Sequence, residues 1–254
     1  MKKALIMTSI AFVLLLAVVA AGLNVIFTVT YIEASFTTCS LQGEEDAKAL
    51  KAELDEFVGD STTFLKLDKV KAAVEKYPCF RLESVKKKLP KAVEVTVRER
   101  RELFAYQTED GKYAMIDTEG VCIRLSDDNV SRTGGENVLL KNFSLTAEVG
   151  QPVSGAYFDA LLSAFAGFEA YLTDARANVR EVVLSYNASS QALNSFDIEM
   201  QEGCVIVMYN PLSRADEKAK KAVEVYQGFD DIQKMYSSIV VAEDRESGEI
   251  NTSP

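Results

Sequence analysis

The stretch Lys86–Tyr106, KKKLPKAVEVTVRERRELFAY, decides how the rest of the chain is interpreted. A basic run meets Pro90, and valines then alternate with polar residues at Val93, Val95 and Val97. Successive side chains of a strand point to opposite faces, so this period of two predicts a strand with one buried face. The sequence therefore favours a small sheet domain built around residues 92–100.

The segment before it, CFRLESVKKKL at 79–89, is predicted to form the other strand of a hairpin, with the proline in the turn. Eight basic residues stand among three acids between Arg81 and Arg101. A solvated sheet face explains this charge simply. The alternative is a docking patch for an acidic partner, formed by Lys86, Lys87, Lys88, Arg98 and Arg100.

Composition excludes several classes of function. The 254-residue chain has a formal net charge of −10 and contains no histidine. The acidic balance argues against nucleic acid as the main partner and against broad adhesion to an anionic membrane. Without imidazole, Ser-His-Asp and Cys-His catalysis and the commonest catalytic zinc sites are excluded within the chain. No glycine-rich phosphate loop occurs either. We therefore expect no catalytic residue, cofactor, metal site or small-molecule substrate.

The four cysteines, Cys39, Cys79, Cys122 and Cys204, form no CxxC motif. This spacing argues against a structural zinc site and against a redox motif. Two disulfides are possible in an oxidising compartment. The alternative is four small, buried apolar residues, because free cysteine is among the most buried residue types. The sequence leaves the two interpretations open.

The N-terminal region predicts a membrane anchor. No charge occurs from residue 4 to residue 29, and a membrane-spanning helix needs about 20 mainly apolar residues. Lys2 and Lys3 precede the run, so the positive-inside rule places residues 1–3 in the cytoplasm and everything beyond the anchor outside. We expect a single-pass protein of the cell membrane. The alternative is a signal peptide cleaved near AVVAAG, which would release a secreted enzyme or binding protein.

The remaining pattern predicts an α+β fold in two domains. Residues 30–101 are expected to run strand, helix, helix, strand, strand, with Asp68 capping the second helix. Residues 102–243 are expected to form a second mixed αβ domain with a mostly antiparallel sheet, which begins with three short strands over 103–125 and ends with the strand SSIVVAE. The last strand is expected at a sheet edge, and residues 244–254 are expected to be a polar tail with a disordered end.

Two segments carry a resemblance to a known family. They are KYPCFRLESVKKKLPKAVEVTVRERRELFAY at 76–106 and DGKYAMIDTEGVCIRL at 110–125. The order βααββ directly after an anchor resembles the POTRA module. The pattern P-x-x-V-x-V-x-V-x-E-R, followed by ID-x-x-G-V, resembles the bacterial FtsQ/DivIB cell-division family. These motifs span about Tyr77 to Val121, and the rest of the chain is similar mainly in its layout.

The resemblance implies a non-catalytic scaffold of the division machinery, enriched at the septum, with a POTRA-like domain and a β domain outside the membrane. Such a protein binds partners similar to FtsB/DivIC and FtsL and helps to regulate septal cell-wall synthesis. Family members are understood to take up a partner strand beside their last strand. The resemblance places the partner-binding residues at Val240, Val241, Ala242, Asp244, Arg245 and Gly248.

Overall fold

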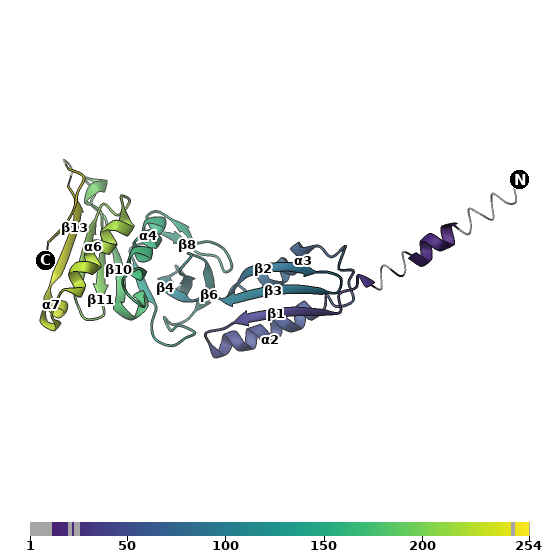
Figure 1. Ribbon diagram of the computed structural model, residues 1–254. Helices are drawn as coiled ribbons and strands as arrows, with labels where there is room; N and C mark the ends of the chain where they lie inside the picture. Colours follow the sequence, from purple (N-terminus) through teal and green to yellow (C-terminus); the bar gives the residue numbers. More distant parts are fainter. Residues whose placement is uncertain (1–11, 20–21, 23–25, 245–246, 254) are drawn as a thin grey trace, which may run out of the picture. The chain divides into compact units, whose positions relative to one another are not determined.

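The computed structural model describes residues 12–19, 22, 26–244 and 247–253, and it is a mixed α+β protein (Figure 1). The chain divides into two compact units at residues 1–99 and 100–254. The division falls two residues before the domain boundary expected from the sequence.

The first unit has the element order βααββ that the sequence predicts. Its three-stranded sheet has the order β1-β3-β2, with β1 parallel and β2 antiparallel to the central strand β3. The elements are β1 (Tyr31–Thr37), α2 (Leu41–Asp55), α3 (Leu67–Glu75), β2 (Phe80–Lys88) and β3 (Ala92–Glu99).

The valines of β3 carry the core of this unit. Val93, Val95 and Val97 are fully buried, as the alternation predicts. Ile32 lies beside Val93 in the register of β1. The other buried residues of the core include Leu50 and Leu54 of α2 and Val70 and Val74 of α3. The helices therefore cover one face of the sheet, and the opposite face carries the polar residues of β3.

The second helix of this unit, α3, begins two residues earlier than predicted. The sequence predicts Asp68 as the capping residue, but the cap position is Lys66, whose side chain makes no capping hydrogen bond. Asp68 lies inside the first turn, where its carboxylate still favours the positive end of the helix dipole.

A buried carboxylate joins the end of β3 to the start of α2. Glu99 accepts hydrogen bonds from the backbone N–H groups of Cys39 (2.6 Å) and Ser40 (3.0 Å) and from the Ser40 hydroxyl. The Ser40 hydroxyl in turn caps the helix by accepting from the N–H of Gly43 at 2.9 Å. The sequence pattern places Glu99 among the solvated charges of the hairpin, and this prediction is wrong. The Glu99 side chain is buried because its carboxylate accepts hydrogen bonds from the backbone and the hydroxyl group that precede α2.

Gly43 tests this arrangement. Alanine normally stabilises a helix relative to glycine by about 1 kcal/mol. Here an added Cβ would overlap the Glu99 carboxylate. We expect Gly43→Ala to destabilise the first unit by about 1–3 kcal/mol, the usual loss when a buried polar group is left unpaired. Chemical denaturation of the full chain in detergent measures the change. Lys48→Ala, at an exposed position of the same helix, is the control, and equal stability of the two variants would contradict the expectation.

The second unit is built on a nine-stranded sheet with the order β14-β13-β12-β11-β10-β7-β4-β5-β6. Neighbouring strands are antiparallel except for the pairs β4–β7, β7–β10 and β12–β13. The strands are β4 (Glu102–Gln107), β5 (Tyr113–Asp117), β6 (Cys122–Ser126), β7 (Val138–Lys141), β10 (Val179–Ser185), β11 (Ser195–Met200), β12 (Val205–Tyr209), β13 (Ser238–Glu243) and β14 (Ile250–Ser253). A separate pair, β8 (Leu145–Thr146) with β9 (Ser154–Gly155), completes the β structure.

Two helices, α4 (Phe158–Glu169) and α6 (Ala215–Gln227), contribute the helical side of the core. They pack closely against each other, because an added Cβ at Gly167 of α4 would collide with the backbone of Asp216 in α6. The aromatic residues Phe158, Phe165 and Phe168 of α4 are buried with Phe104 of β4, and Phe104 meets the Phe165 ring edge-on at 4.7 Å. Two short helices, α5 (Ala175–Asn178) and α7 (Asp231–Tyr236), connect other elements.

The end of the chain corrects the expected polar tail. Residues 250–253 form β14, which pairs antiparallel with β13, and Ile250 is buried in the core. The expected disorder is therefore wrong for these residues. Burial of the apolar Ile250 side chain favours pairing of this segment with β13. The three residues that follow Ile250 are polar, so the sequence shows no apolar pattern that would predict a strand.

None of the four cysteines, all of which lie in the described part of the chain, forms a disulfide bond. Cys79, Cys122 and Cys204 are buried, in agreement with small apolar residues of the core, while Cys39 is exposed. Burial raises the pKa of the Cys122 thiol to about 11, so the thiolate that disulfide chemistry needs is disfavoured there.

Half of the expected anchor at 4–29 falls on residues that are not described. Residues 1–11, 20–21 and 23–25 lie outside the described ranges, and residues 12–19 are helical. Within those ranges, no helix combines the length and the apolar character that a membrane crossing requires.

Candidate partner-binding site

The strand that forms the sheet edge is β14. The sequence predicts SSIVVAE as the edge strand, but β13 has neighbours on both sides, β12 in parallel and β14 antiparallel. Val241 lies opposite Met208 on one side and Thr252 on the other. The expectation that β13 offers a free backbone is therefore wrong, because the chain itself supplies the strand that occupies that place.

In the stretch EDRESG at 243–248, Glu243 ends β13, and the described residues Asp244, Ser247 and Gly248 stand between β13 and β14. The N–H of Asp244 donates to the carbonyl of Glu249 at 2.8 Å, and the N–H of Gly248 donates to the carbonyl of Asp244 at 2.9 Å. The Asp244 carboxylate accepts from the N–H of Ser247 at 2.8 Å. Gly248 has a φ of 69°, which glycine adopts without strain. Arg245 lies outside the described residues.

The three apolar residues assigned to partner binding do not share a face. Val241 is fully buried against the helices, and Val240 and Ala242 point to the opposite, partly exposed face of the sheet. Because β14 already lies beside all three residues, a strand added at the edge would pair with β14 and not with them. The three residues are consecutive in the backbone of β13, but their side chains do not form one surface.

The hydrogen bond between Asp244 and Glu249 fixes which groups of β14 face outward. In an antiparallel pair, hydrogen-bonded and non-hydrogen-bonded residue pairs alternate. The pairs Ala242–Asn251 and Val240–Ser253 are then hydrogen-bonded, and Val241–Thr252 is not. The N–H and C=O of Thr252 consequently point away from β13. They present a backbone donor and acceptor at the free side of the sheet.

A buried lysine supports this end of the sheet. Lys218 of α6 is 0% exposed, and its ammonium group donates to the carbonyls of Tyr209 (3.1 Å), the last residue of β12, and of Asn210 (2.8 Å), the next residue. Its Nζ also lies 3.9 Å from a carboxylate oxygen of Glu243 at the end of β13. Burial lowers the pKa of Lys218, and the Glu243 carboxylate partly opposes this shift. One side chain thus links the ends of two neighbouring strands to the helix that crosses between them.

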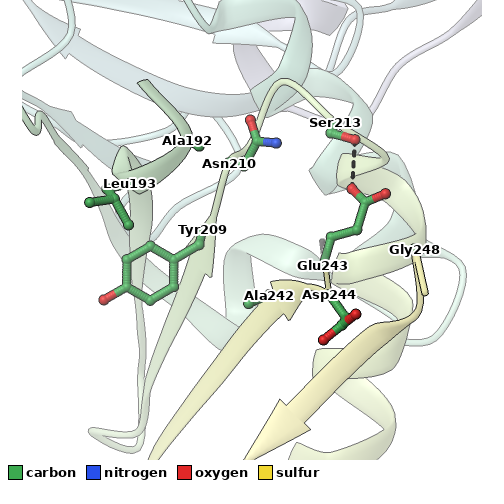
Figure 2. A pocket seen from close by; sticks show the side chains of 9 residues that line it. All are labelled: Ala192, Leu193, Tyr209, Asn210, Ser213, Ala242, Glu243, Asp244 and Gly248. Atoms are coloured by element: carbon green, nitrogen blue, oxygen red, sulfur yellow. Dashed lines mark hydrogen bonds between the residues drawn. The ribbon is translucent and has the colours of Figure 1, made fainter. Parts of the chain in front are cut away.

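An open hollow of about 480 Å³ lies beside this cluster. Figure 2 shows the side chains around it, with the Ser213 hydroxyl bonded to the Glu243 carboxylate at 2.8 Å. Arg214 fastens the hairpin turn from the same side by donating to the carbonyl of Gly248 at 2.7 Å. The lining residues are Ala192, Leu193, Tyr209, Asn210, Ser213, Ala242, Glu243, Asp244 and Gly248. Several of their polar groups form hydrogen bonds that hold the strand ends and the turn, which suits a structural cluster better than a reactive site.

The basic hairpin face contains only part of the predicted docking patch. Lys86 and Lys88 are exposed, but Lys88 pairs with Glu33 at 2.7 Å and Glu94 at 3.1 Å. Arg98 pairs with Glu83 at 2.7 Å, and the Lys87 ammonium donates to the carbonyl of Thr63 at 2.8 Å. This face is a mixture of both charges.

Arg100 does not belong to the hairpin face. It lies in the second unit, where its side chain is 17% exposed and is paired with Asp117 and Glu119. The docking patch predicted from five basic residues is therefore divided between the two units. One nitrogen of Arg100, Nη1, contacts both carboxylates, and this partly buried pairing gives the side chain a structural role.

No protein-family model matches the sequence, and no curated protein matches it either.

Replacing Lys218 tests the support of the sheet edge. Lys218→Met keeps the length of the side chain and removes three interactions, and we expect a loss of about 1–3 kcal/mol of stability because two carbonyls lose their buried donor. Lys220→Met is the matched control on the same helix. Lys220 forms only an exposed pair with Asp216, so its replacement should change stability by less than about 0.5 kcal/mol. Urea denaturation followed by circular dichroism measures both, and equal losses would remove the structural role of Lys218.

Proposed function

We propose that the protein is a non-catalytic scaffold of the bacterial division machinery, held in the cell membrane by residues 4–29 with its N-terminus inside. In this proposal the βααββ unit is a POTRA-like domain and the second unit is the β domain. The scaffold joins partners similar to FtsB/DivIC and FtsL outside the membrane and helps to regulate septal wall synthesis. The observation that carries the proposal is the free side of β14.

The edge favours binding through the backbone. Among the described strands, β14 has a neighbour only on the side of β13. An exposed edge of this kind takes up a partner strand, and main-chain hydrogen bonds supply the affinity. The side chains of Asn251, Thr252 and Ser253 are polar, so the edge offers little apolar surface for unspecific association. A partner is then selected by the alternation of its own side chains above and below the sheet.

The support of the edge also fits a binding role. Lys218, Arg214 and the Asp244 turn hold β12, β13 and the hairpin in fixed positions. A rigid edge loses little conformational entropy when a partner strand is added. Binding then costs mainly the ordering of the partner.

Proline at position 252 tests the edge. Because the N–H of Thr252 points away from β13, Thr252→Pro removes an outward donor and leaves the hairpin bonds in place. We expect the affinity for the FtsB/DivIC-like partner to fall on the order of tenfold, the equivalent of one strong hydrogen bond. Thr252→Val, which retains both backbone groups, should bind as the unaltered chain does. Co-purification from detergent, with titration of the partner, gives the affinities.

A second substitution distinguishes addition to β14 from replacement of β14. The N–H of Asn251 points toward β13, so Asn251→Pro weakens the hairpin itself. Stronger partner capture by Asn251→Pro would mean that the partner strand takes the place of β14 beside β13. Unchanged capture by both proline variants would remove the edge from the proposal.

The anchor has its own test, which also addresses a secreted enzyme or binding protein. A retained anchor predicts that the mature chain keeps residues 1–30 and sediments with membranes after a carbonate wash. The mass of the purified protein and membrane fractionation measure this. A mature chain that begins after AVVAAG and remains in the soluble fraction would contradict the membrane-held scaffold.

A further inference from the structure

The apolar N-terminal run enters the first unit without a free linker. The N–H of Thr62 donates to the carbonyl of Phe27 at 2.6 Å, and Val29 exchanges backbone hydrogen bonds with Gly59 and Asp60. Val29 is itself buried. On the other side, the N–H of Thr30 donates to the carbonyl of Lys91 at 2.7 Å. Residues 27–30 are therefore hydrogen-bonded to the segment before α3 on one side and to the turn between β2 and β3 on the other.

These bonds define one end of the first unit. The register pairs Tyr31 with Ala92, so β1 and β3 begin at this end, and β2 finishes there because Lys88 lies opposite Ala92. Two connections lie at the same end. They are the segment 58–66 before α3 and the turn 89–91 between β2 and β3. The other end of the sheet, where Thr37 pairs with Arg98, leads to Leu41 at the start of α2.

Large apolar side chains are exposed on both connections. Phe64 is 82% exposed, and Leu89 in the hairpin turn is 63% exposed. Val58 adds a third exposed apolar side chain on the first connection. The Lys87 ammonium holds the backbone of that connection at Thr63, so Phe64 projects from a fixed loop. Exposed apolar residues grouped in this way mark a surface that contacts something else.

Lysines accompany these apolar residues. Lys66, Lys69 and Lys91 are exposed, and in the described part of the chain none of them forms an ion pair. Several acids at this end are already paired with other lysines: Asp68 with Lys71 at 3.4 Å, and Glu33 and Glu94 with Lys88. Asp60 lines the same connection. A hollow of about 350 Å³ lies between Phe64, Lys66 and Lys69. Basic side chains beside apolar ones are the combination that suits a surface of anionic lipid headgroups.

We infer that this end of the first unit is a membrane-contacting rim, formed by Val58, Phe64, Lys66, Lys69, Leu89 and Lys91. Phe64 and Leu89 enter the interfacial layer of the bilayer, and the lysines contact the phosphates of anionic phospholipids. The inference rests on the proposed anchor, because only a run that stays in the membrane holds the rim against it. The contact is local, so it agrees with an overall charge of −10 that disfavours broad adhesion.

The absence of tryptophan from the sequence gives a direct test. Phe64→Trp and Leu89→Trp each introduce a single fluorophore at the rim. Leu41→Trp is the matched control, because Leu41 is also 82% exposed but lies at the other end of the sheet, about 20 Å away along the strands. The full chain is reconstituted into vesicles of phosphatidylcholine and phosphatidylglycerol with brominated acyl chains. We expect several-fold stronger quenching for the two rim variants than for the control.

The charge of the rim is tested in the same vesicles. In the Phe64→Trp chain, Lys66→Glu with Lys69→Glu should reduce quenching severalfold when phosphatidylglycerol is present. The substitution Lys48→Glu, on the exposed side of α2, should leave quenching unchanged. Phosphatidylcholine alone should give weak quenching for every variant.

The outcomes separate the rim from the anchor. A chain that floats with the vesicles but shows equal quenching at positions 64, 89 and 41 would overturn the rim and leave the anchor intact. Quenching at the rim that is indifferent to the lysine reversals and to phosphatidylglycerol would overturn its specificity for anionic lipid. A chain that does not float with the vesicles would overturn both the anchor and the rim.

Discussion

The first unit depends on the way β3 is held in the middle of its sheet. Its valines lie on one face under both helices, and the carboxylate at its end accepts the backbone donors that precede α2. Buried charge is costly unless it is fully hydrogen-bonded, and Glu99 meets that condition with three donors. The glycine at position 43 is then required by space. β3 is thus the central strand of the sheet and also holds the residues at which the first helix, α2, begins.

The second unit uses a lysine for a comparable purpose. The crossover from β12 through α6 to β13 places the two strands in parallel, and their ends leave backbone carbonyls without partners in the sheet. Lys218 reaches two of these carbonyls from the buried side of α6. Its ammonium remains close to a carboxylate, which offsets part of the cost of burial. Both units therefore place a single ionised group where regular secondary structure ends.

Much of the fold follows from the sequence because periodicity reports burial directly. The alternation in β3 and the apolar stripe of α4 predict their own buried faces, and the hairpin turns at Gly111 and Gly120 lie where the dipeptides DG and EG stand. Short elements are missed, among them β7, α5 and α7. Each has too few residues to show a period. Their existence depends on neighbours that are distant in the chain.

The site shows the same limit more sharply. The position of Lys218 on the stripe of Ala215, Ala219 and Ala222 is a visible signal, since a charge on an apolar stripe needs a buried partner. The identity of the edge strand carries no such signal. The order of strands in a mixed sheet is a property of the whole chain, and β14 becomes the edge because it pairs with β13, which has β12 on its other side.

The composition of β14 has a consequence for colloidal behaviour. The strand next to it, SIVVAE, combines β-branched residues with little charge, and such a strand at an open border promotes self-association between copies. The short strand β14 protects β13 from such association, because it accepts and donates the backbone hydrogen bonds on that side of β13. The side chains that β14 then exposes at the edge are those of Asn, Thr and Ser. Shortening the chain before Gly248 would uncover the aliphatic strand, and the shortened protein would tend to form fibrils or inclusion bodies.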